Sequence, residues 1–278
     1  MKLIFSRLFL SAVALTFLIG PIFFAGLAQA AGAETSKVIK FAVNNLKVYE
    51  DTTKVLAAEV GKLGYTLEYI FLADNTQINE AVESGDYFAN YHQHTPYMEE
   101  FNRGHKGHLV AAFAVFTDKS GIFSKKYKSL GDLPEGARIS LPVDVGNNFR
   151  TYVMLAQAGL IKIRPGVEGP AITQNDIIEN PKKLEFIEVD YTMLGRAMEE
   201  ADAGFLYATV AAEIDLDISK DALATEPVEY QAADIIAVRE ENLDDPRTGI
   251  LKKAYYTDAL KHALRDSYAG RDILDPAW

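Results

Sequence analysis

Stretches of alternating hydrophobic residues and stretches with hydrophobic residues at helical spacing follow one another along the chain from residue 38 onward. The first predicted strands are 38–43, 66–72 and 87–93, and the helices that follow them are 52–63, 75–82 and 97–103. Both periodicities are read from the positions of the apolar side chains. Regular alternation of strand and helix is typical of a mainly parallel, doubly wound sheet.

The rest of the chain continues with the same kinds of pattern. Strands are predicted at 109–116, 120–124, 137–141, 161–163, 184–189, 204–207 and 235–238, and helices at 149–159, 173–178, 192–199, 246–254 and 257–268. The strands at 109–116 and 120–124 have the character of a crossing into a second lobe. We therefore expect a two-lobed α/β protein, with residues 31–117 plus 231–278 in lobe 1 and residues 118–230 in lobe 2.

The first thirty residues have the pattern of an export signal. Lys2 and Arg7 precede an uncharged stretch, residues 8–27, and Ala28-Gln29-Ala30 supplies the small-x-small pattern of a cleavage site. An uncleaved anchor is the alternative, because the apolar run is long. The chain contains no cysteine, which argues against a thioether lipid tether and excludes disulfides. We therefore expect a signal peptide at residues 1–30 and an exported, periplasmic or extracytoplasmic protein that is soluble after cleavage and not lipidated.

Charge and motifs exclude several classes of function. The chain has a net charge of −11, which is unfavourable for binding to nucleic acid or to an anionic membrane. It contains no nucleophile elbow, P-loop, dinucleotide-binding fingerprint or zincin motif. We therefore expect neither an enzyme nor a cofactor, and no nucleic acid among the partners.

Four of the five histidines, His92, His94, His105 and His108, fall within seventeen residues. Side chains alternate along a strand, so His92 and His94 are expected on one face. Two histidines from a strand, one from the following loop and a carboxylate would form a zinc site. In the alternative interpretation His94 orders the turn from strand to helix, while His105 and His108 are solvated. The sequence leaves both interpretations open.

Arg150 is the charged residue with the clearest predicted role. It follows residues 146–149 in the first turn of the helix predicted at 149–159. The free N–H groups of a helix N-terminus attract anions, and a guanidinium adds bidentate geometry for a carboxylate. In the alternative, Arg150 covers its own helix end with its charged group in water. Because a cation at a helix N-terminus opposes the dipole, the position favours an anionic partner such as a ligand carboxylate.

A set of short segments, in a fixed order from about residue 38 to the end, carries a family resemblance. They are Asn90-Tyr91 with Gln93-His94-Thr95-Pro96-Tyr97, the run 121–130, Leu133-Pro134-Glu135-Gly136, Asp144 with Asn147 and Arg150, Ile178-Glu179-Asn180-Pro181-Lys182, and Pro276-Ala277-Trp278. The chain resembles the methionine-binding, NlpA-type family of extracytoplasmic solute receptors. The resemblance implies the type II periplasmic-binding-protein fold, whose two lobes close on a free amino acid. It also implies the permease and ATPase of an ABC importer as partners.

The same resemblance assigns roles to several residues. It implies that Arg150 takes the α-carboxylate of the ligand, that Tyr91 and His94 line the cleft, and that Asn147 shapes the wall of the second lobe. The ligand of the family is usually methionine, so methionine is the first candidate for this chain.

Four positions depart from the pattern of the family. His92 replaces a Phe, Tyr207 and Thr209 lie where an Asn-Gly-Asn run is usual, and Asp234 replaces an Asn. A further segment at 46–48 replaces Gly-Pro-His. These changes predict a more polar site, and the expected ligand is methionine, a more polar or cationic amino acid, or a dipeptide. The zinc-binding receptor remains the alternative function.

Overall fold

The computed structural model describes residues 36–268, 271 and 273–278. The predicted signal peptide at 1–30 and the first residues assigned to lobe 1 lie outside the described residues. The chain from Ser36 to Trp278 forms one compact unit. Within its described part, every helix is too short or too polar to cross a membrane.

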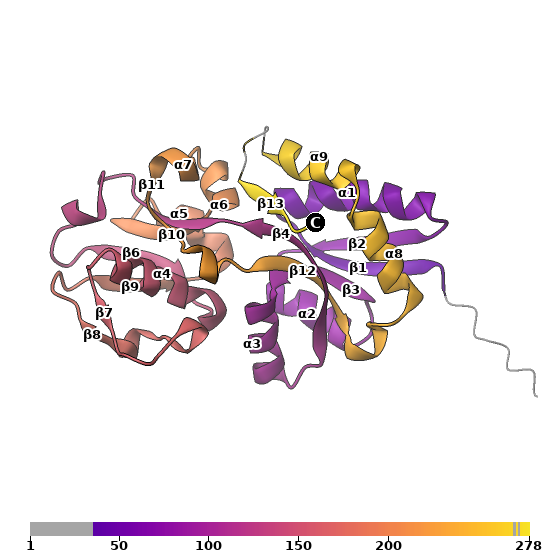
Figure 1. Ribbon diagram of the computed structural model, residues 1–278, viewed down its shortest axis with the longest axis horizontal. Coiled ribbons are helices and arrows are strands. Elements are labelled where there is room, and N and C mark those ends of the chain that lie inside the picture. The colour runs from indigo at the N-terminus through magenta and orange to yellow at the C-terminus, as the bar shows by residue number, and fades with distance from the viewer. Residues whose placement is uncertain (1–35, 269–270, 272) are drawn as a thin grey trace, which may run out of the picture. The chain divides into compact units, whose positions relative to one another are not determined.

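The first of two large sheets contains six strands in the order β13-β4-β12-β3-β1-β2 (Figure 1). Its strands are β1 (Val38–Asn44), β2 (Thr66–Leu72), β3 (Ala89–His94), β4 (Leu109–Asp118), β12 (Ala233–Arg239) and β13 (Leu274–Pro276). The helices that pack on it are α1 (Lys47–Lys62), α2 (Asn75–Glu83), α3 (Thr95–His105), α8 (Pro246–Tyr255) and α9 (Asp258–Ser267). Helices α1, α8 and α9 cover one face of this sheet, and α2 and α3 cover the other.

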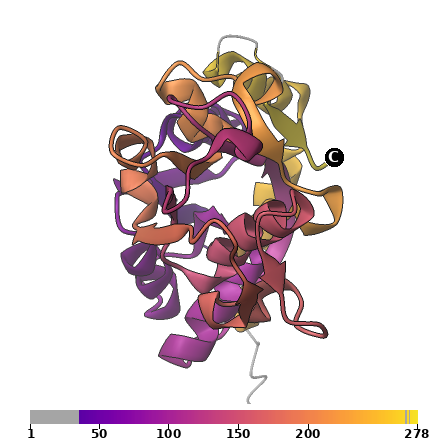
Figure 2. The ribbon, with the colours of Figure 1, turned by 90° about the vertical axis from the view of Figure 1, so that its left-hand side faces the viewer.

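The second sheet contains five strands in the order β11-β5-β10-β6-β9, and its end of the molecule faces the viewer in Figure 2. Its strands are β5 (Ser120–Phe123), β6 (Arg138–Pro142), β9 (Glu185–Val189), β10 (Ala203–Tyr207) and β11 (Ala222–Thr225). The associated helices are α4 (Val145–Gln157), α5 (Leu194–Ala197), α6 (Ala208–Glu213) and α7 (Ile218–Asp221), and β7 (Lys162–Ile163) pairs with β8 (Ile177–Glu179). Single 3-10 turns are η1 (Leu130–Asp132), η2 (Gly169–Ala171), η3 (Gln174–Asp176), η4 (Tyr191–Met193), η5 (Val228–Tyr230) and η6 (Glu240–Asn242).

This two-lobed α/β architecture is the one predicted, but both sheets are mixed rather than mainly parallel. Strand β1 runs parallel to β2 and β3, whereas β12 runs antiparallel to β3 and β4. In the second sheet β10 is parallel to β6 and antiparallel to β5. Strands β5 and β12, by which the chain enters the second sheet and returns to the first, run antiparallel to β10 and β3. Strand β4 directly precedes β5, and β11 and the turn η5 precede β12, so neither entry follows the crossover helix of a parallel connection. The C-terminal strand β13 is also antiparallel, to β4. The lobe boundaries at 117/118 and 230/231 stay predictions.

Most predicted elements are present, with three kinds of difference. The helix predicted at 173–178 is wrong, because this segment forms η3 followed by β8. The helix predicted at 149–159 starts earlier, at Val145. Elements α6, α7, β11 and β13 were not predicted; each has six residues or fewer. Such short segments are stabilised by tertiary packing rather than by their own periodicity.

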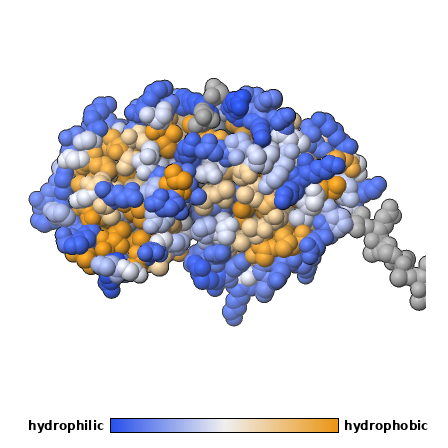
Figure 3. All heavy atoms as spheres, in the orientation of Figure 1, coloured by the Kyte–Doolittle hydropathy of each residue, from blue (hydrophilic) through white to orange (hydrophobic). Residues whose placement is uncertain are grey.

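Apolar side chains of both sheets and their helices form the core. On β1, the consecutive residues Phe41, Ala42 and Val43 are fully buried, as expected for a strand covered on both faces. Helix α9 contributes Leu260 and Leu264 to the same core, and the outer side of α1 and α9 is hydrophilic in Figure 3. The packed core fixes the strand ends from which the functional pocket is built.

Candidate functional site

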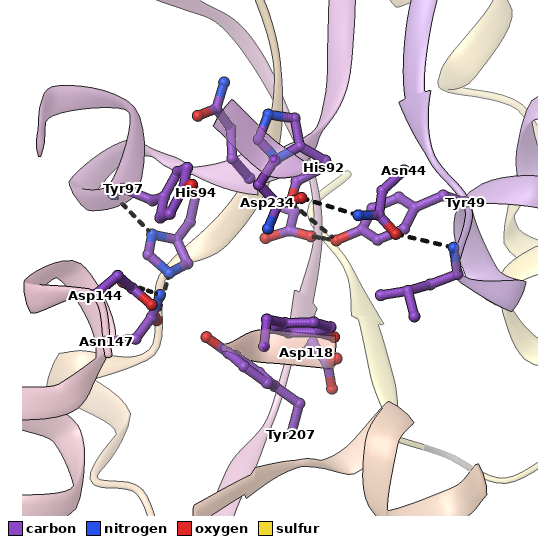
Figure 4. Close-up of a pocket in the computed structure, with 14 residues that line it drawn as sticks. Asn44, Tyr49, His92, His94, Tyr97, Asp118, Asp144, Asn147, Tyr207 and Asp234 are labelled. Carbon is purple, nitrogen blue, oxygen red and sulfur yellow. Dashed lines mark hydrogen bonds between the residues drawn. The ribbon is translucent and has the colours of Figure 1, made fainter. Parts of the chain in front are cut away.

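A narrow pocket, with a cavity volume of about 40 Å³, lies between strand and helix ends of the two sheets (Figure 4). The first sheet and its helices supply Asn44, Tyr49, Asn75, His92, His94 and Asp234, among others. The elements of the second sheet supply Asp144, Asn147, Tyr191 and Tyr207. Binding sites of open α/β sheets commonly lie at such strand ends. The pocket is therefore the candidate ligand site.

A β-bulge in β3 shapes one wall of the pocket. Ile235 of β12 pairs with Gln93 and Ile236 pairs with Tyr91, which leaves His92 without a partner on β12. An extra residue of this kind bends a strand and redirects its side chains. As a result His92, Gln93 and His94 all line the pocket. Strict alternation, on which the sequence prediction relied, would have turned Gln93 away.

His92 is neutral and belongs to a buried network of amides. Its Nε2 lies 3.0 Å from Oδ1 of Asn79, which also accepts hydrogen bonds from Asn90 and Gln93. Because Asn79 Oδ1 can only accept, Nε2 of His92 carries the proton and donates. Its Nδ1 is then a buried acceptor, and it has no hydrogen-bond partner among the described residues. Burial, reinforced by the nearby His94, lowers the pKa of His92 to about 3.

His94 connects the two lobes through Asn147. The backbone N–H of Tyr97 donates to Nδ1 of His94, which makes His94 the N-cap of α3. Nε2 must therefore carry the proton, and it donates to Oδ1 of Asn147 at 2.7 Å. Burial first, and the charge of Arg150 second, lower the pKa of His94 to about 4. The interpretation that His94 orders the strand-to-helix turn is confirmed.

Three carboxyl groups line the pocket, and desolvation raises the pKa of each. The pKa of Asp234 rises to about 6, although a hydrogen bond of 2.5 Å from the Tyr49 hydroxyl opposes the change. That of Asp144 also rises to about 6. The pKa of Asp118 rises to about 8 because desolvation and the nearby Asp234 outweigh its hydrogen bonds from Thr209. Asp118 and Asp144 are only half-buried by surface area, but the walls around them exclude most water.

Arg150 lies behind the pocket wall rather than on it. Nε and Nη2 form a bidentate ion pair with Glu226, and Nη2 also donates to Ser120. Nη1 donates to Oδ1 of Asn147 at 2.9 Å and to the Tyr207 hydroxyl at 3.5 Å. All five N–H donors of the guanidinium are thus engaged. Burial alone would lower the pKa of Arg150, but Tyr207 and Glu226 outweigh burial and the pKa is raised.

The position of Arg150 in its helix also differs from the prediction. Helix α4 begins at Val145 with Asp144 as its N-cap, so Arg150 lies in the second turn and not beside the free N–H groups. The proposed contact with a ligand carboxylate remains a prediction. Of its donor atoms, only Nη1 points toward residues that line the pocket, namely Asn147 and Tyr207.

Two further candidates do not line the pocket. Tyr91 is fully buried, and its hydroxyl is bonded to those of Tyr255 at 2.6 Å and Thr52 at 3.2 Å. It belongs to the core, because strand β3 is covered on both faces. Thr209 is buried and donates its hydroxyl hydrogen bond to Asp118, so it positions a lining residue. The other ligand candidates, His92, His94, Asn147, Tyr207 and Asp234, do line the pocket.

The four clustered histidines do not form a zinc site. His105 stacks on Phe101, with ring centroids 4.5 Å apart, and its Nδ1 lies 3.2 Å from the Phe101 carbonyl oxygen. His108 is exposed and bonded to Glu83. Among the described residues, no three His, Asp or Glu side chains are placed to bind one metal ion. The alternative with His92, His94, His105 and His108 as ligands is therefore wrong, since α3 separates the two pairs.

The comparison with protein families identifies the chain. Residues 39–278 match the family model of the NlpA lipoprotein. The chain belongs to the NlpA lipoprotein family. Similar members include the methionine-binding lipoprotein MetQ of Bacillus subtilis, 34% identical over 272 residues that cover 95% of this chain and 97% of the relative. The D-methionine-binding lipoprotein MetQ of Escherichia coli is 33% identical over 213 residues, covering 75% and 78%.

Solved structures agree with this family and with the fold. A nutrient binding protein from Burkholderia cenocepacia bound to methionine has a TM-score of 0.78 and 32% identity, covering 86% of this chain and 100% of that one. A periplasmic substrate-binding protein of an ABC transporter from Coxiella burnetii has a TM-score of 0.79 and 29% identity, covering 86% and 100%.

Membership of the NlpA lipoprotein family corrects the predicted localisation. The expectation of a soluble protein without a lipid is wrong, because the matched family and the relatives above are lipoproteins. The expectation rested on the absence of cysteine, and an absence does not show how a protein is held at a membrane.

Several residues that line the pocket of this NlpA family member were not predicted. Asp118 and Asp144 were not among the ligand candidates, although Asp118 follows the strand predicted at 109–116 and Asp144 precedes the helix predicted at 149–159. The available signal was a carboxylate at the last residue of β4 and another directly before α4, where strand and helix ends meet. Glu226, the partner of Arg150, follows β11, a strand that was not predicted.

Proposed function

We propose that this protein is the extracytoplasmic solute-binding component of an ABC importer and that it binds one free amino acid in the pocket. The observation that carries the proposal is the placement of complementary groups on opposite walls. Asp234 provides a carboxylate on the side of the first sheet, and Nη1 of Arg150 lies behind Asn147 and Tyr207 on the other. An amino acid presents an ammonium and a carboxylate that match this pair.

The α-ammonium is assigned to Asp234. This carboxylate is 7% exposed, and the hydrogen bond that it receives in the described structure comes from the neutral Tyr49 hydroxyl. A buried anion is unfavourable without a positive or donating partner. An ammonium group would supply both the charge and the hydrogen bonds.

The α-carboxylate is assigned to Nη1 of Arg150. The bond from Nη1 to the Tyr207 hydroxyl, at 3.5 Å, is long for a hydrogen bond. A ligand carboxylate would replace this weak contact without breaking the ion pair with Glu226. The hydroxyl of Tyr207 would then be free to donate to the ligand as well.

The role in an importer is supported by the relatives. The neighbour from Coxiella burnetii is a substrate-binding protein of an ABC transporter, and the neighbour from Burkholderia cenocepacia is bound to methionine. We propose a permease and an ATPase as the partners of this chain on the same ground. Catalysis has no support in the site, since the histidines that line it are engaged in structural hydrogen bonds.

The proposal is tested by binding measurements on the full chain after it has been unfolded in guanidinium and refolded without ligand. Calorimetry with the twenty amino acids is expected to identify a ligand that binds with 1:1 stoichiometry. The same ligand with its amine acetylated, or with its carboxylate amidated, should bind about 30-fold more weakly or worse, because truncating a buried charge pair costs about 2–5 kcal/mol. Equal binding of the blocked ligands, or no binding of any amino acid, would refute the proposal.

A further inference from the structure

The pocket has an excess of acidic groups. It adjoins a second hollow, with which it shares the lining residues Asn75, Tyr97, Asp144 and Tyr191. The outer hollow adds Asp74 and Asp190. Among the described residues that line the two hollows there is no lysine and no arginine. The pocket and its mouth thus offer negative groups without a cation on the wall.

Two of these carboxylates lie on different walls of the pocket. In Figure 4, Asp234 lies beside Tyr49, while Asp144 lies beside Asn147 on the opposite side of the pocket. Within the described part of the chain, no three His, Asp or Glu side chains could hold a single metal ion. An elongated ligand with positive groups at two positions can reach both carboxylates.

A count of charges shows which carboxylate lacks a partner. The α-ammonium of a bound amino acid would neutralise Asp234, and its carboxylate would face Arg150, whose charge is already offset by Glu226. Asp144 would remain. The hydrogen bond that it receives from a side chain comes from the neutral amide of Asn147, at 2.8 Å. Its pKa of about 6 leaves it largely ionised at neutral pH, and desolvation makes that charge unfavourable without a cation.

The pocket wall also contains a buried hydrogen-bond acceptor. His92 lines the pocket, is 7% exposed, and has an Nδ1 atom without a hydrogen-bond partner among the described residues. Because Nε2 of His92 donates to Asn79, Nδ1 is an acceptor. The wall around the carboxylates therefore has one acceptor without a partner in the described part of the chain, and it offers no added positive charge.

We infer that the ligand is a basic amino acid, whose side-chain ammonium or guanidinium lies against Asp144 while its α-ammonium lies against Asp234. The inference rests on the proposed function and narrows it to a class of ligand. The side chain would pass Tyr97, around which Asp144, Asp74 and Asp190 are grouped. The last two are exposed at the mouth of the pocket, where they attract cations from solution.

The deciding experiment compares matched pairs of ligands on the refolded full chain. L-lysine is compared with L-norleucine, which lacks the terminal amine, and L-arginine with L-citrulline, which lacks the charge. L-methionine is included as the ligand named for the relatives. Calorimetry is expected to show that at least one basic amino acid binds about 30-fold or more tightly than its neutral counterpart and than methionine.

A variant locates the preference at one residue. Asp144→Asn should lower the affinity for the basic ligand about 30-fold and change that for norleucine or citrulline by less than about threefold. Glu68→Gln, on the exposed side of β2, removes the same charge far from the pocket and should change neither. General misfolding of Asp144→Asn would weaken both kinds of ligand and is thereby distinguished from loss of the charge pair.

The outcomes separate the inference from the proposed function. If methionine or norleucine binds as tightly as lysine and arginine, the inference is wrong and the proposed amino-acid receptor stands. If Asp144→Asn weakens basic and neutral ligands equally, the assignment of the side-chain cation to Asp144 is wrong. If no amino acid binds at all, the proposed function itself fails.

Discussion

Arg150 and Glu226 form an ion pair that is almost completely removed from solvent. The two residues are 3% and 4% exposed, and the guanidinium has a hydrogen-bond acceptor for each of its five N–H groups. Such a pair is not by itself strongly stabilising, because two charges have lost their hydration. Removal of one partner is costly, since the other charge is then buried alone.

We predict that Arg150→Ala lowers the free energy of unfolding by about 3–5 kcal/mol. The variant is therefore a poor test of ligand binding. The double variant Arg150→Met with Glu226→Leu should recover most of this loss, because no charge is left buried without a partner. Denaturant unfolding monitored by circular dichroism measures all three proteins. A loss below about 1 kcal/mol for Arg150→Ala, as for an exposed arginine, would contradict the buried pair.

At the scale of elements, the sequence predicted the long strands and helices but not the bulge or the start of α4. Strand β3 was predicted from its apolar and β-forming residues. The bulge at His92 depends on its pairing with β12, more than a hundred residues later. Helix α4 was expected to start after Gly146, Asn147 and Asn148, because these residues favour turns. In the structure they are helical, since packing against the other lobe outweighs their local preference.

Gly146 has a specific reason to be glycine. A Cβ atom at this position would lie 3.3 Å from both the backbone N and the Cα of Tyr97 in α3, and 3.3 Å from the Asp144 carboxylate. The first turn of α4 therefore approaches the start of α3 closely, and the absence of a side chain permits this contact. The approach also brings Asn147 within 2.7 Å of His94. Contact between the lobes at the pocket thus depends on Gly146.

We predict that Gly146→Ala weakens ligand binding by about 1–2 kcal/mol, or about 5- to 30-fold, because the added methyl group overpacks the contact between α3 and α4. Calorimetry on refolded protein measures the affinity. Gly249→Ala is the matched control: it lies within α8, and nothing approaches its added Cβ within 4 Å. It should stabilise the helix by up to about 1 kcal/mol and leave affinity unchanged. If the two variants bind the ligand with equal affinity, the contact between α3 and α4 at Gly146 does not affect ligand binding.

At the scale of the whole molecule, the buried acids and histidines make stability depend on pH in opposite directions. The pKa values of Asp118, Asp144 and Asp234 are raised in the folded protein. The stabilisation that these groups contribute is fully present below the ordinary carboxyl pKa. It is lost as the pH rises through their pKa values in the folded protein. The pKa values of His92 and His94 are lowered, so their effect is a loss of stability as the pH falls below about 6.5.

Between pH 6.5 and 8 the main contribution to the pH dependence of stability comes from Asp118, whose pKa is about 8. The folded protein holds a proton there that the unfolded chain has released. We therefore predict that the free energy of unfolding of the ligand-free protein falls by about 1–2 kcal/mol from pH 6.5 to pH 8. Urea unfolding at several pH values provides the measurement. Asp118→Asn should flatten this dependence, and a wild-type stability that rises over the same range would show that the carboxyl is ionised throughout.

The fold as a whole was predictable because long periodic segments alternate in a regular order. The candidate site was predictable where it depended on residues close in sequence, as for His94 and Tyr97, or for Asn147 and Asp144. It was not predictable where distant segments meet, as for Glu226 with Arg150. The hydrogen-bond geometry of Arg150 depends on the connection between the sheets, which periodicity does not reveal.

The connection between the sheets has a mechanical consequence. Ser120 begins β5 directly after the chain leaves the first sheet, and Glu226 lies on the return path before β12. The backbone N–H of Glu226 donates to the Ser120 carbonyl oxygen at 3.0 Å, and Arg150 is bonded to both side chains. One guanidinium thus couples two adjacent crossing segments through side-chain bonds to both. We expect the two segments to twist together, so that torsion at the joint is transmitted to both lobes.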